Sequence, residues 1–166
     1  MSEIRVDAIK TRAGAVPKAV DVGLNITGNV LQVNQGSLSS ETTTTSSSFV
    51  DTGLSVTITP TSTSNKVLIL ASLGSATVVE ASGADAQGKF QIVRDSTSLF
   101  ISKLRSYDYG NSGTIFIGPV FMSYLDSPST TSEITYKIQQ RLVAGDSIRL
   151  SEDNAPSFIQ VLEIGG

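Results

Sequence analysis

Short runs in which apolar and polar side chains alternate fill the chain from residue 49 to its end. In one such run Val56 and Ile58 alternate with threonines, and a period of two is typical of a strand with one buried face. The runs predict strands at residues 66–72, 89–94, 98–103, 114–118, 120–125, 133–142, 147–150 and 157–164, and a loop at 78–88. Turn-forming residues separate these runs, so the pattern predicts an all-β fold, an antiparallel β-sandwich or jelly roll.

The first 36 residues contain too few apolar side chains to form a core of their own. Pro17 and several glycines argue against a long helix there. We therefore predict an extended N-terminal arm at 1–36 that lies on another surface, a Ser/Thr-rich connector at 37–48 and the sandwich at 49–166. The apolar residues through which the arm is expected to attach are Ile4, Val6, Ile9, Val20, Val22, Leu24 and Ile26.

Several predicted strands are apolar on both faces. In the last strand Ile159 and Val161 point to one side, and Phe158, Leu162 and Ile164 point to the other. One side can line the sandwich core, but a small antiparallel sandwich has no helices to cover the second side. We expect copies of the chain to associate through that side; the alternative is that long loops or the arm cover it.

The composition excludes several classes of protein. All 166 residues include no His and no Cys, which removes thiol chemistry, zinc-finger spacings and triads built on either residue. The 12 basic and 15 acidic residues are not clustered, so we expect no nucleic-acid partner. The longest apolar run, residues 67–71, is too short to cross a bilayer, and the N-terminus lacks the apolar stretch of a signal peptide. We expect no membrane association.

The acidic residues offer weak candidates for chemistry. Glu152, Asp153 and Asn154 could supply oxygen ligands for calcium, but the Asp/Gly pattern of a calcium loop is absent, so a solvated turn is favoured. Asp126 precedes Ser-Pro and is interpreted as the start of a turn rather than a catalytic acid. We therefore predict no catalytic residue, no metal and no cofactor.

A predicted loop at residues 106–113 carries two tyrosines, an acid and an amide. Exposed aromatic rings beside hydrogen-bonding groups are typical of sites for sugars or protein surfaces. The candidate receptor-binding residues are Tyr107, Asp108, Tyr109 and Asn111. The alternative is a hairpin loop whose tyrosines pack back on the sheet edge.

Residues 49–166 resemble the small jelly-roll modules of tailed-phage fibre and virion-surface proteins, which are related in shape to the C1q/TNF-like trimeric heads. The segments that carry the resemblance are residues 49–60, 64–69, 90–95, 124–128, 134–138 and 159–164. The resemblance implies a homotrimer around a threefold axis, with Phe158, Leu162 and Ile164 at the interface. It also implies that residues 1–36 attach the protein to other virion proteins of the capsid or tail after synthesis in a host cytoplasm.

These features lead to one functional hypothesis and two alternatives. The main hypothesis is a non-enzymatic virion structural protein, a short spike whose head attaches to a glycan or protein of the host surface. No shaft of repeats separates arm and head, which argues against a long fibre. The first alternative is a capsid decoration or cement protein whose arm clamps neighbouring subunits. The second, a depolymerase with paired carboxylates, is disfavoured because no acid/base pair is recognisable.

Overall fold

The computed structural model describes residues 27–81, 84–107 and 114–166. All the arm residues predicted to anchor the protein, from Ile4 to Ile26, lie outside these ranges, as do Asp108, Tyr109 and Asn111. No helix in the described ranges has the length and apolar character needed to cross a lipid bilayer.

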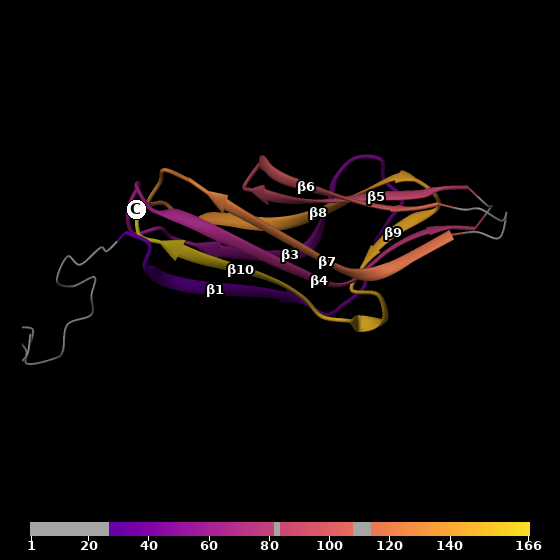
Figure 1. The fold of residues 1–166 in the computed structure, drawn as a ribbon, viewed down its shortest axis with the longest axis horizontal. Helices are drawn as coiled ribbons and strands as arrows, with labels where there is room; N and C mark the ends of the chain where they lie inside the picture. The colour runs from indigo at the N-terminus through magenta and orange to yellow at the C-terminus, as the bar shows by residue number, and fades with distance from the viewer. Residues whose placement is uncertain (1–26, 82–83, 108–113) are drawn as a thin grey trace, which may run out of the picture.

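Two stacked antiparallel sheets form the molecule (Figure 1). The six-stranded sheet contains, in spatial order, β1 (Val30–Leu38), β10 (Ser157–Ile164), β4 (Lys66–Glu80), β9 (Ser147–Leu150) and β2 (Thr42–Thr44), with β7 (Thr114–Asp126) also paired to β4. The four-stranded sheet contains β3 (Val50–Ile58), β8 (Ile134–Ala144), β5 (Ala86–Arg94) and β6 (Thr97–Ser106). The predicted all-β jelly-roll sandwich is confirmed.

The core lies between the two sheets and follows the predicted alternation. In β3 the side chains of Leu54, Val56 and Ile58 are buried, while the residues between them are exposed. Phe90 and Tyr136 are the largest fully buried side chains among the described residues. Burial of apolar area at about 25 cal/mol per Å² is the main favourable term in the stability of such a sandwich.

The sandwich begins earlier in the chain than the predicted boundary at residue 49. Val30–Leu38, expected in the arm and connector, forms β1 and pairs along β10. Sequence reasoning missed this strand because two of its inward-facing residues, Gln32 and Asn34, are polar. In place of apolar contacts, they donate side-chain hydrogen bonds of 2.7 Å to backbone carbonyls next to and within β3. Gly36 is also required there, since a Cβ would collide with the Ser55 carbonyl.

Two other strand boundaries differ from the prediction. Residues 114–126 form one strand, β7, instead of two, because β7 lies at the sheet edge and in the described residues pairs only with β4, so Pro119 interrupts no second ladder. The predicted loop at 78–88 is shorter, since β4 continues to Glu80 and β5 starts at Ala86. A register shift between Leu73 and Ala76 lets β4 keep Val78 in the core.

β4 runs along the whole molecule and defines its two ends. Its 15 residues span about 45 Å. Lys66 pairs with Ile164 at one end, where Gly28 also donates a 2.7 Å hydrogen bond to Gly165. We call this the arm end, because residues 1–26 precede it. Glu80 lies at the other, distal end, where β6 finishes and Tyr107 follows (Figure 1).

Candidate functional site

The outer side of the six-stranded sheet is organised in layers by the pairing register. Side chains directly opposite one another on neighbouring strands lie about 5 Å apart and form continuous rows. The register aligns four apolar side chains across four strands, and we call this row the leucine layer: Val33, Leu162, Leu68 and Leu125.

Two further layers lie closer to the distal end. The glutamine layer consists of Gln35, Gln160, Leu70 and Ser123. The phenylalanine layer consists of Ser37, Phe158, Ser72 and Phe121. Together the three layers form what we call the apolar face, and none of its twelve residues is charged.

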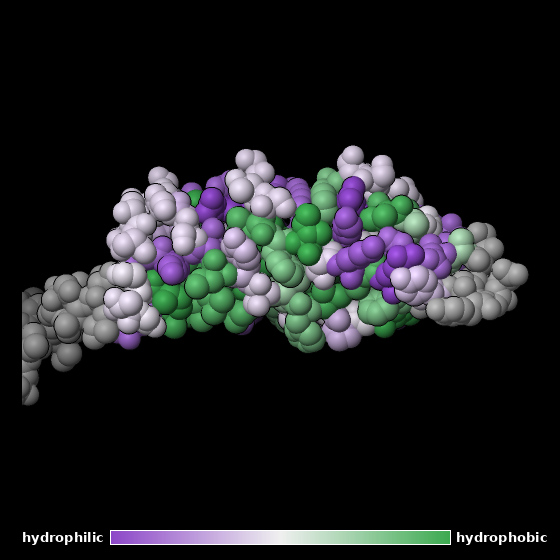
Figure 2. Space-filling view, turned by 45° about the horizontal axis from the view of Figure 1, so that its top comes forward, coloured by the Kyte–Doolittle hydropathy of each residue, from purple (hydrophilic) through white to green (hydrophobic). Residues whose placement is uncertain are grey.

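Large side chains on the apolar face are exposed to solvent. Phe121 is 73% exposed, Val33 55% and Leu125 50%. In the view of Figure 2, apolar surface runs along the lower part of the molecule from near the arm end past its middle, and hydrophilic surface lies above it and nearer the distal end. Contiguous apolar surface of this kind marks an interaction site in a folded protein.

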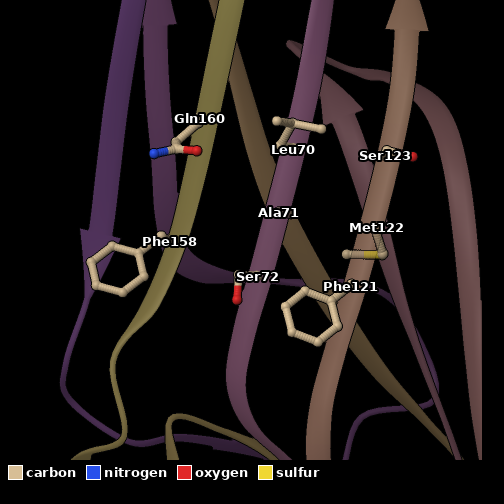
Figure 3. Close-up of a pocket in the computed structure, with 8 residues that line it drawn as sticks. All are labelled: Leu70, Ala71, Ser72, Phe121, Met122, Ser123, Phe158 and Gln160. Carbon is tan, nitrogen blue, oxygen red and sulfur yellow. The ribbon is translucent and has the colours of Figure 1, made fainter.

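A groove of about 320 Å³ crosses the glutamine and phenylalanine layers. The rings of Phe158 and Phe121 stand on either side of Ser72, while Gln160 and Leu70 lie above them (Figure 3). The sulfur-containing side chain of Met122 lies deeper, almost fully buried. The groove is therefore mainly apolar, with polar groups from the serines and from Gln160.

The outer side of the four-stranded sheet has the opposite character. A chain of side-chain hydrogen bonds, which we call the polar ladder, runs from Ser98 to Gln91 (2.8 Å), from Gln91 to Gln139 (2.6 Å) and from Gln139 to Asp51 (2.6 Å). Lys137 adds an ion pair of 2.9 Å to Asp51. The hydrogen bond from Gln139, with that from Lys137, lowers the pKa of Asp51 despite partial burial. This side is polar along the ladder, although Ile101 is exposed next to Gln91.

A buried carboxylate holds the arm end together. Glu163 is fully buried and accepts hydrogen bonds of 2.6 Å from Asn65 Nδ2, from the backbone N–H of Thr61 and from Gln32 Nε2. Burial by itself raises the pKa of Glu163, but the hydrogen bonds outweigh it and the net pKa is lowered. The contacts join β1, β10 and the β3–β4 connection, so the strand that follows the arm is firmly attached.

A second buried cluster connects the two sheets. Asp126, predicted as the start of a turn, is buried and accepts hydrogen bonds of 2.7 Å from the Tyr136 hydroxyl and from Arg94. Burial, together with the bond to Asp126, raises the pKa of Tyr136 far above its usual value. Glu152, considered as a calcium ligand, is paired with Arg149 at 2.7 Å and accepts a hydrogen bond from Thr77. The carboxylates of Asp126 and Glu152 are therefore both bound by side chains of the same chain.

At the distal end, Tyr107 is the described part of the predicted receptor-binding loop. Its ring is 52% exposed, and the guanidinium carbon of Arg105 lies 4.2 Å from the ring centroid. Arg105 is itself held by an ion pair of 2.8 Å to Asp85. The ring is therefore oriented by a fixed cation while much of it stays open to solvent.

Sequence reasoning found only part of the apolar face. It identified Phe158 and Leu162 there, and Ile164 on the same side of β10. It missed Val33, because β1 was assigned to the arm, and it missed Phe121, although that residue lies in the predicted strand 120–125. Three consecutive apolar residues, Val120, Phe121 and Met122, were the available signal of a strand that is apolar on both sides.

A scan of protein-family models finds no match for this chain, and no curated protein sequence matches it. Several solved structures show low similarity to it, each with a TM-score below 0.5. A TNF protein, Eiger, from S. frugiperda is 10% identical over 80% of this chain and 92% of that chain, with a TM-score of 0.46. The tripod from the baseplate of bacteriophage Tuc2009 is 13% identical over 98% of this chain and 80% of that chain, with a TM-score of 0.38.

The VP2 subviral particle of infectious bursal disease virus is also similar, at 11% identity and a TM-score of 0.40. The match covers 98% of this chain but only 38% of that chain, so this chain spans little more than a third of the length of VP2. Similarity at this level leaves function to the chemistry of the surface.

Proposed function

We propose that this chain is a non-enzymatic virion structural protein of a bacteriophage, a short homotrimeric surface spike. The observation that carries the proposal is the apolar face, whose exposed Phe121 and Leu125 lie on the same sheet side as Leu68 and Leu162. Copies of the chain that pack these faces together remove the side chains from water, and association of identical chains most often closes into a ring.

The positions of the two ends support a spike. A ring whose axis runs along the strands brings all arm ends to one side of the assembly and all distal ends to the other. Of the predicted arm 1–36, residues 1–26 then anchor the trimer to capsid or tail proteins, because residues 30–36 belong to β1 of the sandwich. Because Glu163 binds β1 into the sheet, a pull on the arm is transmitted directly to the sandwich.

The distal end carries the proposed attachment function. Tyr107 stands there with its ring open to solvent and oriented by Arg105. An aromatic face beside a cation can stack on a sugar ring or pack against a protein of the host surface. In this proposal Asp108, Tyr109 and Asn111 complete the contact.

Sedimentation velocity of the full chain tests the proposed trimer. We expect the native protein to sediment as a trimer and Phe121→Asp to sediment as a monomer, because the variant places a charge on the apolar face. Ile101→Asp is the matched control, since Ile101 is 48% exposed on the other sheet and its replacement should leave the trimer intact. A native chain that remains monomeric at micromolar concentration contradicts the proposal.

Adsorption of particles that carry altered protein tests the attachment role. Deletion of residues 106–113 should leave the protein on the particle and abolish adsorption to the host. Deletion of residues 1–26, which leaves β1 in place, should remove the protein from the particle. If the first deletion leaves adsorption unchanged, and particles without the protein lose resistance to heat, the protein is a capsid decoration protein instead.

A further inference from the structure

The glutamine layer lies between the leucine and phenylalanine layers and is the only one of the three that carries side-chain amides. Gln160 Nε2 donates a 2.7 Å hydrogen bond to Gln35 Oε1, which ties β10 to β1 across the outer side of the sheet. Among the described residues, Gln160 Oε1 and Gln35 Nε2 form no hydrogen bond. One acceptor and one donor are therefore left to bind a group outside the chain.

The symmetry of a ring determines which residues of the next copy lie opposite Gln160 Oε1 and Gln35 Nε2. Rotation about an axis along the strands leaves each residue at the same height, so each layer faces the same layer of the next copy. Layers are two residues apart along a strand, about 7 Å. A copy shifted by one layer would place the amides of Gln35 and Gln160 against the leucine layer, which has no polar side chain, or against the phenylalanine layer, whose only polar groups are the short hydroxyls of Ser37 and Ser72.

We infer that Gln35 and Gln160 form a register-setting site, in which the free amide groups of one copy hydrogen-bond the same layer of a second copy. This inference rests on the proposed self-association. A buried amide with no partner costs free energy, so every arrangement that separates the glutamine layers is disfavoured. A single polar position in an apolar coiled-coil seam selects register by the same principle.

A second copy fits the apolar face better than a foreign partner. The chain has a net charge of −3, so two copies approach most easily through a surface without charged side chains. The twelve residues of the apolar face meet that condition. Residues 1–26 are the competing occupant, because they precede β1 at the edge of the same sheet.

Leucine substitutions in the full chain test the site. Gln160→Leu and Gln35→Leu each leave one amide without a partner, so each should raise the concentration for half-assembly about tenfold. The double variant removes both amides and should assemble more tightly than either single variant, but into more than one species. Native mass spectrometry measures the number of chains in each assembled species.

Thr57→Leu, which adds a leucine to the outer side of the other sheet, is the control and should behave as native protein.

A spin label reports the relative orientation of the copies. The chain contains no cysteine, so Thr63→Cys places a single label on an exposed residue at the arm end. Copies in register should give one narrow short distance between labels, and the double leucine variant should give a broad distribution.

The two proposals fail in different ways. If the native chain assembles as a single species and the double leucine variant keeps both that species and the narrow distance, the register-setting site is refuted and the spike remains. If the full chain is monomeric but residues 27–166 assemble, the arm occupies the apolar face, and the self-association on which both proposals depend is refuted.

Discussion

The two outer faces of this sandwich are built on the same alternation of side chains and end up with opposite properties. On the four-stranded sheet the polar ladder links Ser98, Gln91, Gln139 and Asp51, so each amide is satisfied within the chain. On the six-stranded sheet the equivalent side carries leucine and phenylalanine layers around a glutamine pair with unused hydrogen-bonding groups. The polar ladder, whose amides are all hydrogen-bonded within the chain, is therefore interpreted as a surface that faces water. The glutamine pair, which keeps a free donor and a free acceptor within an apolar surface, is interpreted as part of a surface that faces a second copy.

The difference also separates two kinds of stability. The buried clusters of Glu163 and of Asp126 with Tyr136 hold a single chain together. The apolar face contributes mainly when copies meet, because much of it stays exposed in one chain. Variants on the apolar face should therefore change assembly, and variants in the clusters should change unfolding.

The largest effect is expected from a charge placed in the leucine layer. Leu162→Asp should weaken assembly by about 100-fold or more, because an unpaired carboxylate would be buried between copies. Analytical ultracentrifugation over a range of concentrations measures this effect. Thr57→Asp, the same charge on the outer side of the four-stranded sheet, should leave assembly within twofold of native protein, about the error of the measurement. Equal effects of the two variants would show that the two faces do not differ in function.

A smaller effect is expected when the buried carboxylate at the arm end is neutralised. Glu163→Gln should lower the free energy of unfolding by about 2 kcal/mol at pH 7, because an amide nitrogen would face the donors of Asn65 and Thr61. Urea denaturation of monomeric Phe121→Asp protein, with and without this change, isolates the effect from assembly. An unchanged midpoint would mean that the cluster contributes nothing to the fold.

The same residue predicts a pH dependence. Because the folded pKa of Glu163 lies below its ordinary value of 4.5, its stabilisation is fully present above that value. It is lost as the pH falls from 4.5 through the lower folded pKa. Thermal unfolding between pH 7 and pH 3 should show a decline below about pH 4.5 that is reduced in Glu163→Gln. A variant that declines as steeply as the native chain would assign the acid sensitivity to other carboxylates.

Removal of the bond from Tyr136 to Asp126 should have an effect of similar or smaller size. Tyr136→Phe keeps the ring in the core and leaves Arg94 as a partner for Asp126, so we expect a loss of about 1–2 kcal/mol in the free energy of unfolding. The state of assembly should not change. If the variant unfolds as the native chain does but no longer assembles, the cluster of Tyr136 and Asp126 supports contacts between copies and not the fold of the single chain.

The smallest effect is expected on the polar ladder. Asp51→Asn should change the free energy of unfolding by less than about 0.5 kcal/mol, because the ion pair with Lys137 lies at the surface with both side chains partly exposed to solvent. Chemical denaturation at low and high salt measures it. A loss as large as that of Glu163→Gln would mean that the ladder is part of the structural core and not a water-facing network.

Local alternation was enough to predict the character of single strands. Leu68 and Ile69, or Val161 and Leu162, are neighbours in sequence and point to opposite sides, as expected for strands with two apolar faces. The predicted strand boundaries were wrong where the composition obscured the alternation of apolar and polar residues, in the polar β1 and around Pro119 of β7. The candidate loop could be assessed only at Tyr107, whose ring is exposed.

The sequence by itself determined that this protein is an all-β sandwich whose strands carry apolar side chains on both sides, because the period of two is a property of neighbouring residues. The tertiary structure decided which side chains form a layer and which carboxylates are buried. Gln35 and Gln160 are 125 residues apart, and their contact depends on the register of β1 against β10. Register is set by hydrogen bonds between distant segments, and local periodicity contains no information about those pairings.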